Sequence, residues 1–433
     1  MENLMSQILF LSLSTLFLIG IAYRILHIRK AIRLGKNWNP PPGTKKQRLY
    51  QTLLLALGQK KMFQKPLPAL LHLLMYLGFW LINLEILEIF IDGSTGSHRI
   101  FFPYMKTFYP VLISFLEVLA LSVLIASIIF LARRNIFPVR RLQHPDLKGF
   151  PKTDAHLILL AEIGLMIAFL CMNTTDQLLQ ERGLYVNTGD FLISQWMMPW
   201  LDPLPTQSLY QIERLAWWGH WIGILGFALY ISYSKHLHIF MAFPNTYYTP
   251  IQVPAKWENM EAIQQELSKT LGDQDVPAQD SQESMPSTFG AQKIQDLNWK
   301  NLMDAYSCTE CGRCTEECPA SLTGKRLSPR LIMMKTRDCA EDVLAQKGKG
   351  ILLDQYISRE EINACTTCMA CVQACPVSIN PMNIIVQLRQ YAMMEESKAP
   401  TAWNEAASNI EINQSPWKFP HDTRTDWATE NTP

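Results

Sequence analysis

The chain has 433 residues, which by length alone is enough for two or three domains. Its 39 basic and 38 acidic side chains nearly cancel, so the net charge of +1 gives no indication of a nucleic-acid partner. Long apolar runs fill the first 245 residues and ordinary soluble sequence fills the rest, and this division sets the expected organisation.

Five runs in the first part are apolar and long enough to cross a bilayer, which takes about twenty residues. They cover residues 6–28, 69–91, 109–132, 156–174 and 215–240, although Glu162 interrupts the fourth. No basic stretch precedes the first run and no small-residue cleavage site follows it, so we expect an uncleaved helix. The sequence therefore predicts a five-helix transmembrane bundle over residues 1–245.

The loops between these runs predict the orientation, because short loops rich in Lys and Arg stay in the cytoplasm. Such residues are frequent in 24–65 and 133–152 and sparse in the loops after the second and fourth runs. We therefore expect a bacterial inner-membrane protein with its N-terminus outside. Everything after about residue 242 then lies in the reducing cytoplasm.

Histidines in the apolar runs indicate haem binding, because ionisable residues inside a membrane are costly and usually functional. His220 and His238 are eighteen residues apart, so on one straight helix they share a face about 27 Å apart along the axis. His238 would then serve an inner haem and His220 an outer one. His72, at the inner end of the second run, is the simplest partner for His238. This pair predicts a bis-histidine b-type haem near the cytoplasmic face.

The remaining histidines leave alternatives open. His156, at the inner end of the fourth run, is either a ligand or an ordinary interfacial residue, and the same alternative holds for His72. His236 lies about 200° round the helix from His238, so both cannot point at one iron. His220 has no partner apart from His98 in an outer loop. We expect one inner haem and leave the second open.

Other polar and aromatic residues lie near the outer ends of the runs. Glu85, Glu88 and Glu117 either carry protons to or from a quinone or are solvated at the headgroup level. Five tryptophans fit an interfacial aromatic belt: Trp196, Trp200, Trp217, Trp218 and Trp221.

Residues 246–298 read as a polar connector with a short helix over Trp257–Leu271. The stretch 273–287 is rich in Asp, Gln, Ser and Pro, and we expect it to be flexible. A cluster domain over 299–394 follows. Residues 395–433 form an extended arm, which is either a solvated tail or a strap that docks a partner.

Eight of the ten cysteines form two runs with one spacing, Cys-x2-Cys-x2-Cys-x3-Cys-Pro. This spacing is typical of bacterial ferredoxins with two [4Fe–4S] clusters, in which the fourth cysteine of each run ligates the other cluster. The first cluster would be held by Cys308, Cys311, Cys314 and Cys375, and the second by Cys365, Cys368, Cys371 and Cys318. Zinc sites usually pair two Cys-x2-Cys knuckles, and disulfides need an oxidising compartment, so both alternatives are disfavoured. Cys171 reads as a packing residue and Cys339 as a spare thiol.

Two segments resemble known families. The segment WWGHWIGILGFALYISYSKHLHIF resembles the last helix of nitrate-reductase-gamma-like cytochromes b, which have five helices and bis-histidine haems. The likeness rests on the histidine spacing and on Ser234, Lys235, His238 and Ile239. That family usually supplies two histidines from its second helix, and only His72 is present here. The segment CTECGRCTEECPASLTGKRLSPR resembles the iron–sulfur module of heterodisulfide-reductase-like proteins.

The resemblance implies a function for the whole. Proteins of this kind are similar to electron-transfer-flavoprotein:menaquinone oxidoreductases and to sulfite-reductase-linked membrane complexes. It implies a lipid-embedded electron-transfer subunit linking a soluble partner, two [4Fe–4S] clusters, haem b and menaquinone. No adjacent cysteine pair occurs in the sequence, so we expect the Cys-Cys-Gly domain of such systems on a separate subunit. An electron-transfer flavoprotein would supply electrons to that subunit. Reverse flow to a disulfide or sulfur compound is the second possibility.

The sequence therefore predicts a mainly α protein, in which a cytoplasmic α-helical dicluster ferredoxin domain follows the five-helix transmembrane bundle. The alternative is a membrane ferredoxin without haem that acts as a redox assembly or maturation factor. Such a factor would not need histidines at haem spacing inside the membrane.

Overall fold

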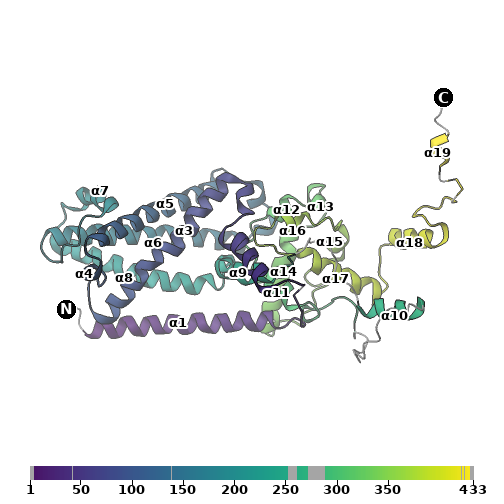
Figure 1. The fold of residues 1–433 in the computed structure, drawn as a ribbon, viewed down its shortest axis with the longest axis horizontal. Coiled ribbons are helices and arrows are strands. Elements are labelled where there is room, and N and C mark those ends of the chain that lie inside the picture. The colour runs from purple at the N-terminus through teal and green to yellow at the C-terminus, as the bar shows by residue number, and fades with distance from the viewer. Residues whose placement is uncertain are drawn as a thin grey trace.

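The computed structural model describes residues 4–40, 42–137, 139–251, 261–271, 288–420, 422–423 and 425–429. The fold is mainly α, with 71% helix, and no strand occurs within these ranges. Long helices form a bundle at one end of an elongated molecule, and short helices form a second body at the other end (Figure 1). The C-terminal helices α18 (Thr401–Asn413) and α19 (Asp426–Thr429) project beyond that second body.

Four segments of the described chain are each long and apolar enough to cross a membrane. They are α1 (Leu4–Ile32), α3 (Pro66–Thr95), Phe102–Asn135, which comprises α4 (Phe102–Met105), a 3₁₀ turn and α5 (Tyr109–Asn135), and α6 (Phe150–Glu181). A fifth span is present only if α8 (Thr206–Ile231) is counted together with the bent segment Lys235–Tyr248 that follows it. The first four predicted runs thus fall within these helices.

The expected continuous helix over 215–240 is wrong. α8 ends at Ile231, and α9 (His238–Tyr248) leaves at an angle of 89° after a short 3₁₀ turn. The Ser234 hydroxyl caps this turn by accepting the N–H of His236 at 3.0 Å, which replaces a bond of the helical ladder. His220 and His238 therefore do not share one face of a straight helix, and their expected separation along a single axis no longer applies.

The second body is built from short helices around the cysteine runs. They are η7 (Ile294–Asp296), α11 (Trp299–Tyr306), α12 (Arg313–Glu316), α13 (Pro319–Leu322), α14 (Pro329–Leu344), α15 (Arg359–Ala364), α16 (Ala370–Ala374) and α17 (Pro381–Met394). Ile332, Ile384 and Leu388 are fully buried in its core. In the expected connector, α10 (Glu261–Leu271) is helical, whereas residues 252–260 and the stretch 273–287 lie outside the described residues.

The tryptophans do not all form the predicted belt. Trp217 and Trp221 are buried, and Trp221 stacks on Phe10 of α1 with ring centroids 4.7 Å apart. Trp196 and Trp200, on α7 (Leu192–Leu201), are largely exposed and keep the expected character. The belt prediction is therefore wrong for Trp217 and Trp221, because these rings fill the space between α1 and α8.

Charged side chains, some of them partly exposed, join the bundle to the second body. α1 runs the length of the bundle, and its C-terminal end reaches α11 and α14 (Figure 1). There Glu341 accepts two bonds from Arg24, at 2.7 and 3.2 Å, and one from the Tyr306 hydroxyl at 2.6 Å. His27 Nε2 lies 2.9 Å from the same carboxylate.

The two basic loops of the bundle also meet the second body. Lys65 and Arg141 both bind Glu316, at 2.6 and 3.1 Å. The loops that the sequence assigns to the cytoplasm therefore lie on the same side of the bundle as the cysteine runs.

Replacing Glu341 with Gln should loosen this joint. Burial would raise the pKa of Glu341, but hydrogen bonds from Arg24 and Tyr306 lower it from 4.5 to about 2. The stabilisation is therefore complete above about pH 4.5 and is lost as the pH falls towards 2. At pH 7 we expect Glu341→Gln to cost about 2 kcal/mol, the value of charged hydrogen bonds, in thermal unfolding of detergent-purified protein.

Glu360→Gln is the matched control, because Glu360 makes only an exposed 3.6 Å pair with Arg326. Its cost should stay below about 0.5 kcal/mol. Equal melting of the two variants would contradict the role of Glu341.

Candidate metal-cofactor sites

The two cysteine runs fold in the same way. In each run the second residue after the first cysteine is left-handed, with φ of +54° at Glu310 and +57° at Thr367. The residue after the second cysteine is left-handed too, with φ of +75° at Gly312 and +63° at Met369. A short helix then begins, α12 or α16. Non-glycine residues rarely adopt this conformation, so its repetition indicates that both backbones are shaped to turn three thiols to one side.

Cysteines of both runs meet at one small cavity. Its lining includes Cys308, Cys311 and Cys314 from the first run and Cys375 and Cys371 from the second. Burial, followed by the neighbouring thiols Cys308 and Cys311, raises the pKa of Cys314 well above its usual range. Such crowded thiols become thiolates only when a metal compensates their charge.

The second set of thiols lies nearer the surface. Burial, followed by the proximity of Cys365, Cys318 and Cys368, raises the pKa of Cys371 to about 12. The thiol of Cys318 is buried, whereas Cys368 is exposed. The structure thus brings Cys318 of the first run to three cysteines of the second, and this second set includes the exposed Cys368.

The spread of these thiols bears on the kind of metal centre. Across the described ranges, no group of three or more His, Cys, Asp or Glu side chains converges on a position for a single ion. Four sulfur ligands of one zinc must all lie about 2.3 Å from it. In a [4Fe–4S] cube each thiolate binds a different iron, so the ligands stand further apart. Cysteines of both runs line one cavity, which is what the exchange of fourth ligands between two such cubes requires.

A larger cavity, of about 300 Å³, lies between the inner end of the bundle and the first thiol set. His72 and His238 line it with ring centroids 6.3 Å apart and planes at 41°. His72 Nδ1 bonds Gln59 Oε1 at 3.1 Å, and His238 Nδ1 bonds the Lys235 carbonyl at 3.0 Å. Each ring therefore keeps Nε2 for a ligand and has its orientation fixed through Nδ1, as metal-binding histidines usually do.

The spacing of the two rings suits a shared iron. An imidazole nitrogen binds a metal at about 2.0 Å and lies about 1.1 Å from its ring centre, so two opposed ligands have centroids about 6 Å apart. The separation of 6.3 Å agrees with this value. The residues present therefore fit a bis-histidine haem.

The other predicted histidines behave differently. His156 uses both nitrogens, bonding the Lys152 carbonyl at 2.8 Å and Asn135 Oδ1 at 3.0 Å, and it is partly buried. The expectation that His236 points away from the iron position relied on a regular helix. In the 3₁₀ turn His236 instead lines the same cavity, with its ring centroid 5.5 Å from that of His238.

His220 is buried without a second imidazole in ring contact within the described structure. Its Nδ1 bonds the Leu165 carbonyl at 3.0 Å, and its ring packs against Phe169. His98 is engaged elsewhere, with Nε2 3.0 Å from Asp176 and its ring 4.2 Å from that of Tyr185. The structure does not bring His98 to His220, so the candidate outer pair is not formed.

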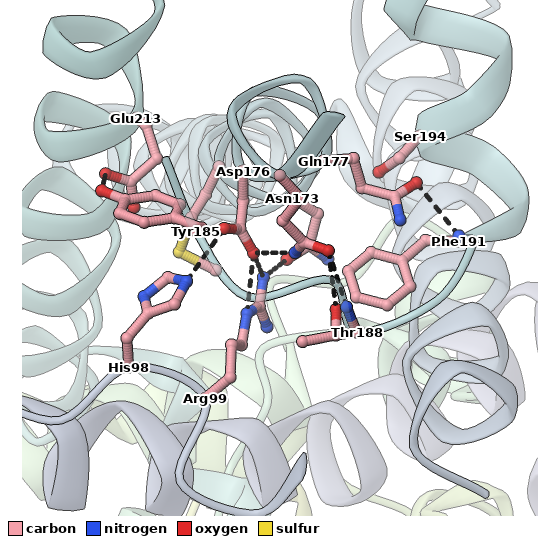
Figure 2. Close-up of polar contacts among 12 residues, drawn as sticks. His98, Arg99, Asn173, Asp176, Gln177, Tyr185, Thr188, Phe191, Ser194 and Glu213 are labelled. Atoms are coloured by element: carbon pink, nitrogen blue, oxygen red, sulfur yellow. Dashed lines mark hydrogen bonds and ion pairs between the residues drawn. The ribbon is translucent and has the colours of Figure 1, made fainter. Parts of the chain in front are cut away.

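A buried polar network (Figure 2) occupies the end of the bundle far from the two cysteine runs (Figure 1). Arg99 donates to Asp176 at 2.9 Å, to Asn173 at 2.7 Å and to Glu85 at 3.2 Å. Glu88 accepts the Tyr109 hydroxyl at 2.7 Å. This network ties the loop after α3 to α6.

Glu117 satisfies the start of α7, because it accepts the N–H groups of Ile193 and Ser194 at 2.8 and 3.2 Å. Glu85, Glu88 and Glu117 are all buried, so the alternative of headgroup solvation is wrong. Their role in proton transfer stays a prediction.

Sequence reasoning missed Arg99, Asn173, Asp176 and Gln177 of this network. Gln177 accepts the Phe191 N–H at 3.0 Å and donates to the Gly189 carbonyl at 2.6 Å. A signal was present, since polar residues recur at helical spacing in the last two turns of α6.

Comparison with known proteins defines the class. The family model for a 4Fe-4S dicluster domain matches residues 292–376. The chain is thus a helical iron–sulfur protein with several candidate membrane spans, related to electron-transferring oxidoreductases.

Individual relatives extend further along the chain. The probable iron-sulfur-binding oxidoreductase FadF of Bacillus subtilis is 27% identical over 422 residues, covering 89% of this chain and 55% of that protein. The EtfAB:quinone oxidoreductase of Syntrophomonas wolfei is 25% identical over 426 residues, covering 89% and 54%. This chain thus spans about half the length of these two relatives.

The cysteine region has further matches. One component of the ferredoxin/F(420)H(2)-dependent CoB-CoM heterodisulfide reductase of Methanosarcina acetivorans is 33% identical over 98 residues, covering 23% of this chain and 52% of that component. The resemblance to heterodisulfide-reductase-like iron–sulfur modules is therefore confirmed for this part. No solved structure matches the chain.

Exchange of the fourth cysteines between the clusters gives a direct test. Cys375→Ser and Cys311→Ser should abolish the same EPR signal of the anaerobically reduced protein, whereas Cys318→Ser and Cys368→Ser should abolish the other. The reason is that Cys375 lines the cavity of the first run. Cys339→Ser, at a buried thiol outside both runs, should leave both signals. Loss of the Cys368-dependent signal in Cys375→Ser would contradict the assignment.

Proposed function

We propose that this chain is the membrane electron-transfer subunit of a quinone-linked oxidoreductase. Electrons pass from a soluble partner through the second cluster, the first cluster and one haem b to menaquinone. The bundle is of the nitrate-reductase-gamma-like cytochrome b type, in a bacterial inner membrane, with the N-terminus outside and residues 299–394 in the cytoplasm. One observation supports this path above others: a single cavity is lined by His72, His238 and Cys311.

The cavity suits haem in its charge as well as in its imidazoles. Apolar side chains such as Met75, Phe79 and Ile158 line it, and Arg133, Arg134 and Arg141 add positive charge. The buried Nε of Arg141 has no hydrogen-bond partner among the described residues. A haem propionate is an acceptor of the right charge for these guanidinium groups. When bound, the haem supplies one-electron transfer, and the protein holds and orients it.

The order of the centres follows from shared walls. Cys311 and Arg313 line both the small thiol cavity and the larger imidazole cavity, so the first cluster adjoins the haem position. Cys368 is exposed, so the second cluster faces solvent and a partner. That partner carries the Cys-Cys-Gly motif and receives electrons from an electron-transfer flavoprotein, a proposal supported by the relative named EtfAB:quinone oxidoreductase.

The exposed arm fits the same interface. α18 begins where Trp403 packs 5.4 Å from the Arg389 guanidinium, and Arg389 also donates to the Cys365 carbonyl. The arm over 395–433 therefore starts beside the second cluster. We propose that it is a strap for the partner. Glu85 and Glu117, buried at the far end, are candidates to exchange the protons of the quinone.

Replacing the two cavity histidines tests the haem. His72→Ala and His238→Ala should each abolish the sharp b-type α-band of the dithionite-reduced-minus-oxidised spectrum, because each removes one of two axial ligands. Both variants should retain about eight non-haem irons, the content of two cubes.

His156→Ala is the matched control, because both of its ring nitrogens are already bonded outside the cavity. It should keep the full α-band. An unchanged α-band in His238→Ala would show the ligand pair to be wrong. A wild-type protein with two clusters and no haem would favour the haem-free membrane ferredoxin.

A further inference from the structure

One arginine beside the first thiol set has an unused donor. Arg330, the second residue of α14, is fully buried and lines the cavity with Cys308, Cys311 and Cys314. Its Nη1 donates to the Arg141 carbonyl at 3.0 Å, and its Nη2 to Asp146 at 3.1 Å. Its Nε has no partner in the part of the chain that the structure describes. A buried N–H without an acceptor costs about 1–3 kcal/mol, so we expect a hydrogen-bond acceptor beside Arg330 Nε when the site is occupied.

The local backbone is shaped to admit the guanidinium. A Cβ atom at Gly312 would lie 2.5 Å from Arg330 Nη1, closer than two such atoms can approach. Gly312 also has a φ of +75°, which favours glycine. The loop between Cys311 and Cys314 can therefore close over Arg330 only because Gly312 lacks a side chain.

The second half of the domain lacks such an arginine. α14 begins with the capping Ser328, then Pro329 and Arg330, and α17 begins with the capping Asn380, then Pro381 and Met382. At the matching position the symmetric repeat thus has an uncharged methionine.

Other cations reinforce this difference. Arg313 lines the first cavity, and the Lys61 ammonium donates to the Cys375 carbonyl at 3.3 Å. Near the second set, Arg389 donates to the Cys365 carbonyl. Two such cations thus lie at the first site and one at the second, and the carboxylate of the first site, Glu310, is itself paired with Lys235 and Arg337.

We propose that Arg330 raises the reduction potential of the first cluster above that of the second. Reduction adds one negative charge to a [4Fe–4S] cluster, and hydrogen bonds to its sulfurs and nearby positive charge stabilise the reduced form. Arg330 supplies both, through Nε and through a guanidinium held in place by Asp146. An electron that enters at the exposed second cluster then moves to the first, beside the imidazole cavity. The inference rests on the two clusters of the proposed function and not on its haem or quinone.

The test is an anaerobic redox titration of the purified full chain, followed by EPR. Arg330→Met copies the residue at the symmetric position. It should lower the potential of the first cluster and leave that of the second unchanged. Because it also removes the guanidinium that pairs with Asp146, we expect the electron distribution between the clusters to change by about tenfold or more, where tenfold is about 59 mV for a one-electron couple. Cys311→Ser and Cys368→Ser identify which signal belongs to which cluster.

Three further variants separate charge, donor and folding. Arg330→Lys keeps the charge and should lower the potential of the first cluster less than Arg330→Met does. Arg330→Gln keeps an N–H donor without charge, so its potential should lie between those of the Lys and Met variants. If Arg330→Met does not retain its iron, the Lys and Gln variants test the effect of Arg330 on the potential. Arg326→Met is the matched control, since Arg326 is 76% exposed and should shift neither potential. Unchanged potentials in iron-replete Arg330 variants, or equal falls in both clusters, would overturn the proposal.

Discussion

The organisation of the protein depends on the contacts of one lysine at the break between α8 and α9. The Lys235 ammonium donates to Glu310 and to the Pro151 carbonyl, both at 2.6 Å. Its N–H donates to Asp154 at 3.2 Å, and its carbonyl accepts from His238 Nδ1 at 3.0 Å. One residue therefore fixes the turn in the bundle, the orientation of a histidine ring and the loop between Cys308 and Cys311. The two cofactor positions cannot shift independently of each other.

The same contact explains how a charged loop is tolerated beside the cysteines. Burial would raise the pKa of Glu310, but Lys235 and Arg337 lower it below its usual range. The Glu310 carboxylate is thus ionised and paired with two cations, which is the condition under which a buried ion is tolerated. Arg330 and Asp146 form a second buried pair beside the first thiol set, 3.1 Å apart. Rigid charge pairs of this kind suit an electron-transfer site, because they need little reorganisation when the charge of the centre changes.

The sequence predicted most reliably what is encoded locally. The cysteine spacing gave the two runs and their exchange of fourth cysteines, and the structure places Cys375 and Cys318 with the opposite runs. The pairing of His72 with His238 followed from their positions at the inner ends of apolar runs, and the rings do face one cavity. The break at Ser234 was missed because hydropathy does not distinguish a straight helix from a bent one. The same break brings His236 to the cavity that His238 lines, although a regular helix would place the two residues about 200° apart.

Long-range polar pairing was beyond local reasoning. Arg99 lies in a loop, and Asp176 follows it by 77 residues. No periodicity relates them, and only the folded bundle brings them together (Figure 2). The buried state of Glu85 depends on this loop, and that of Glu117 depends on the start of α7. A pattern read along single helices could therefore leave these carboxylates open to solvent, as one of the two initial interpretations did.

The most direct test of the proposed electron path is joint quantification of haem and non-haem iron in anaerobically purified protein, with a reduced-minus-oxidised optical spectrum. We expect about eight non-haem irons, the content of two cubes, and one b-type haem per chain. Eight irons without haem would contradict the continuous path from the clusters to the imidazole cavity. Zinc in place of iron would contradict the cluster assignment itself.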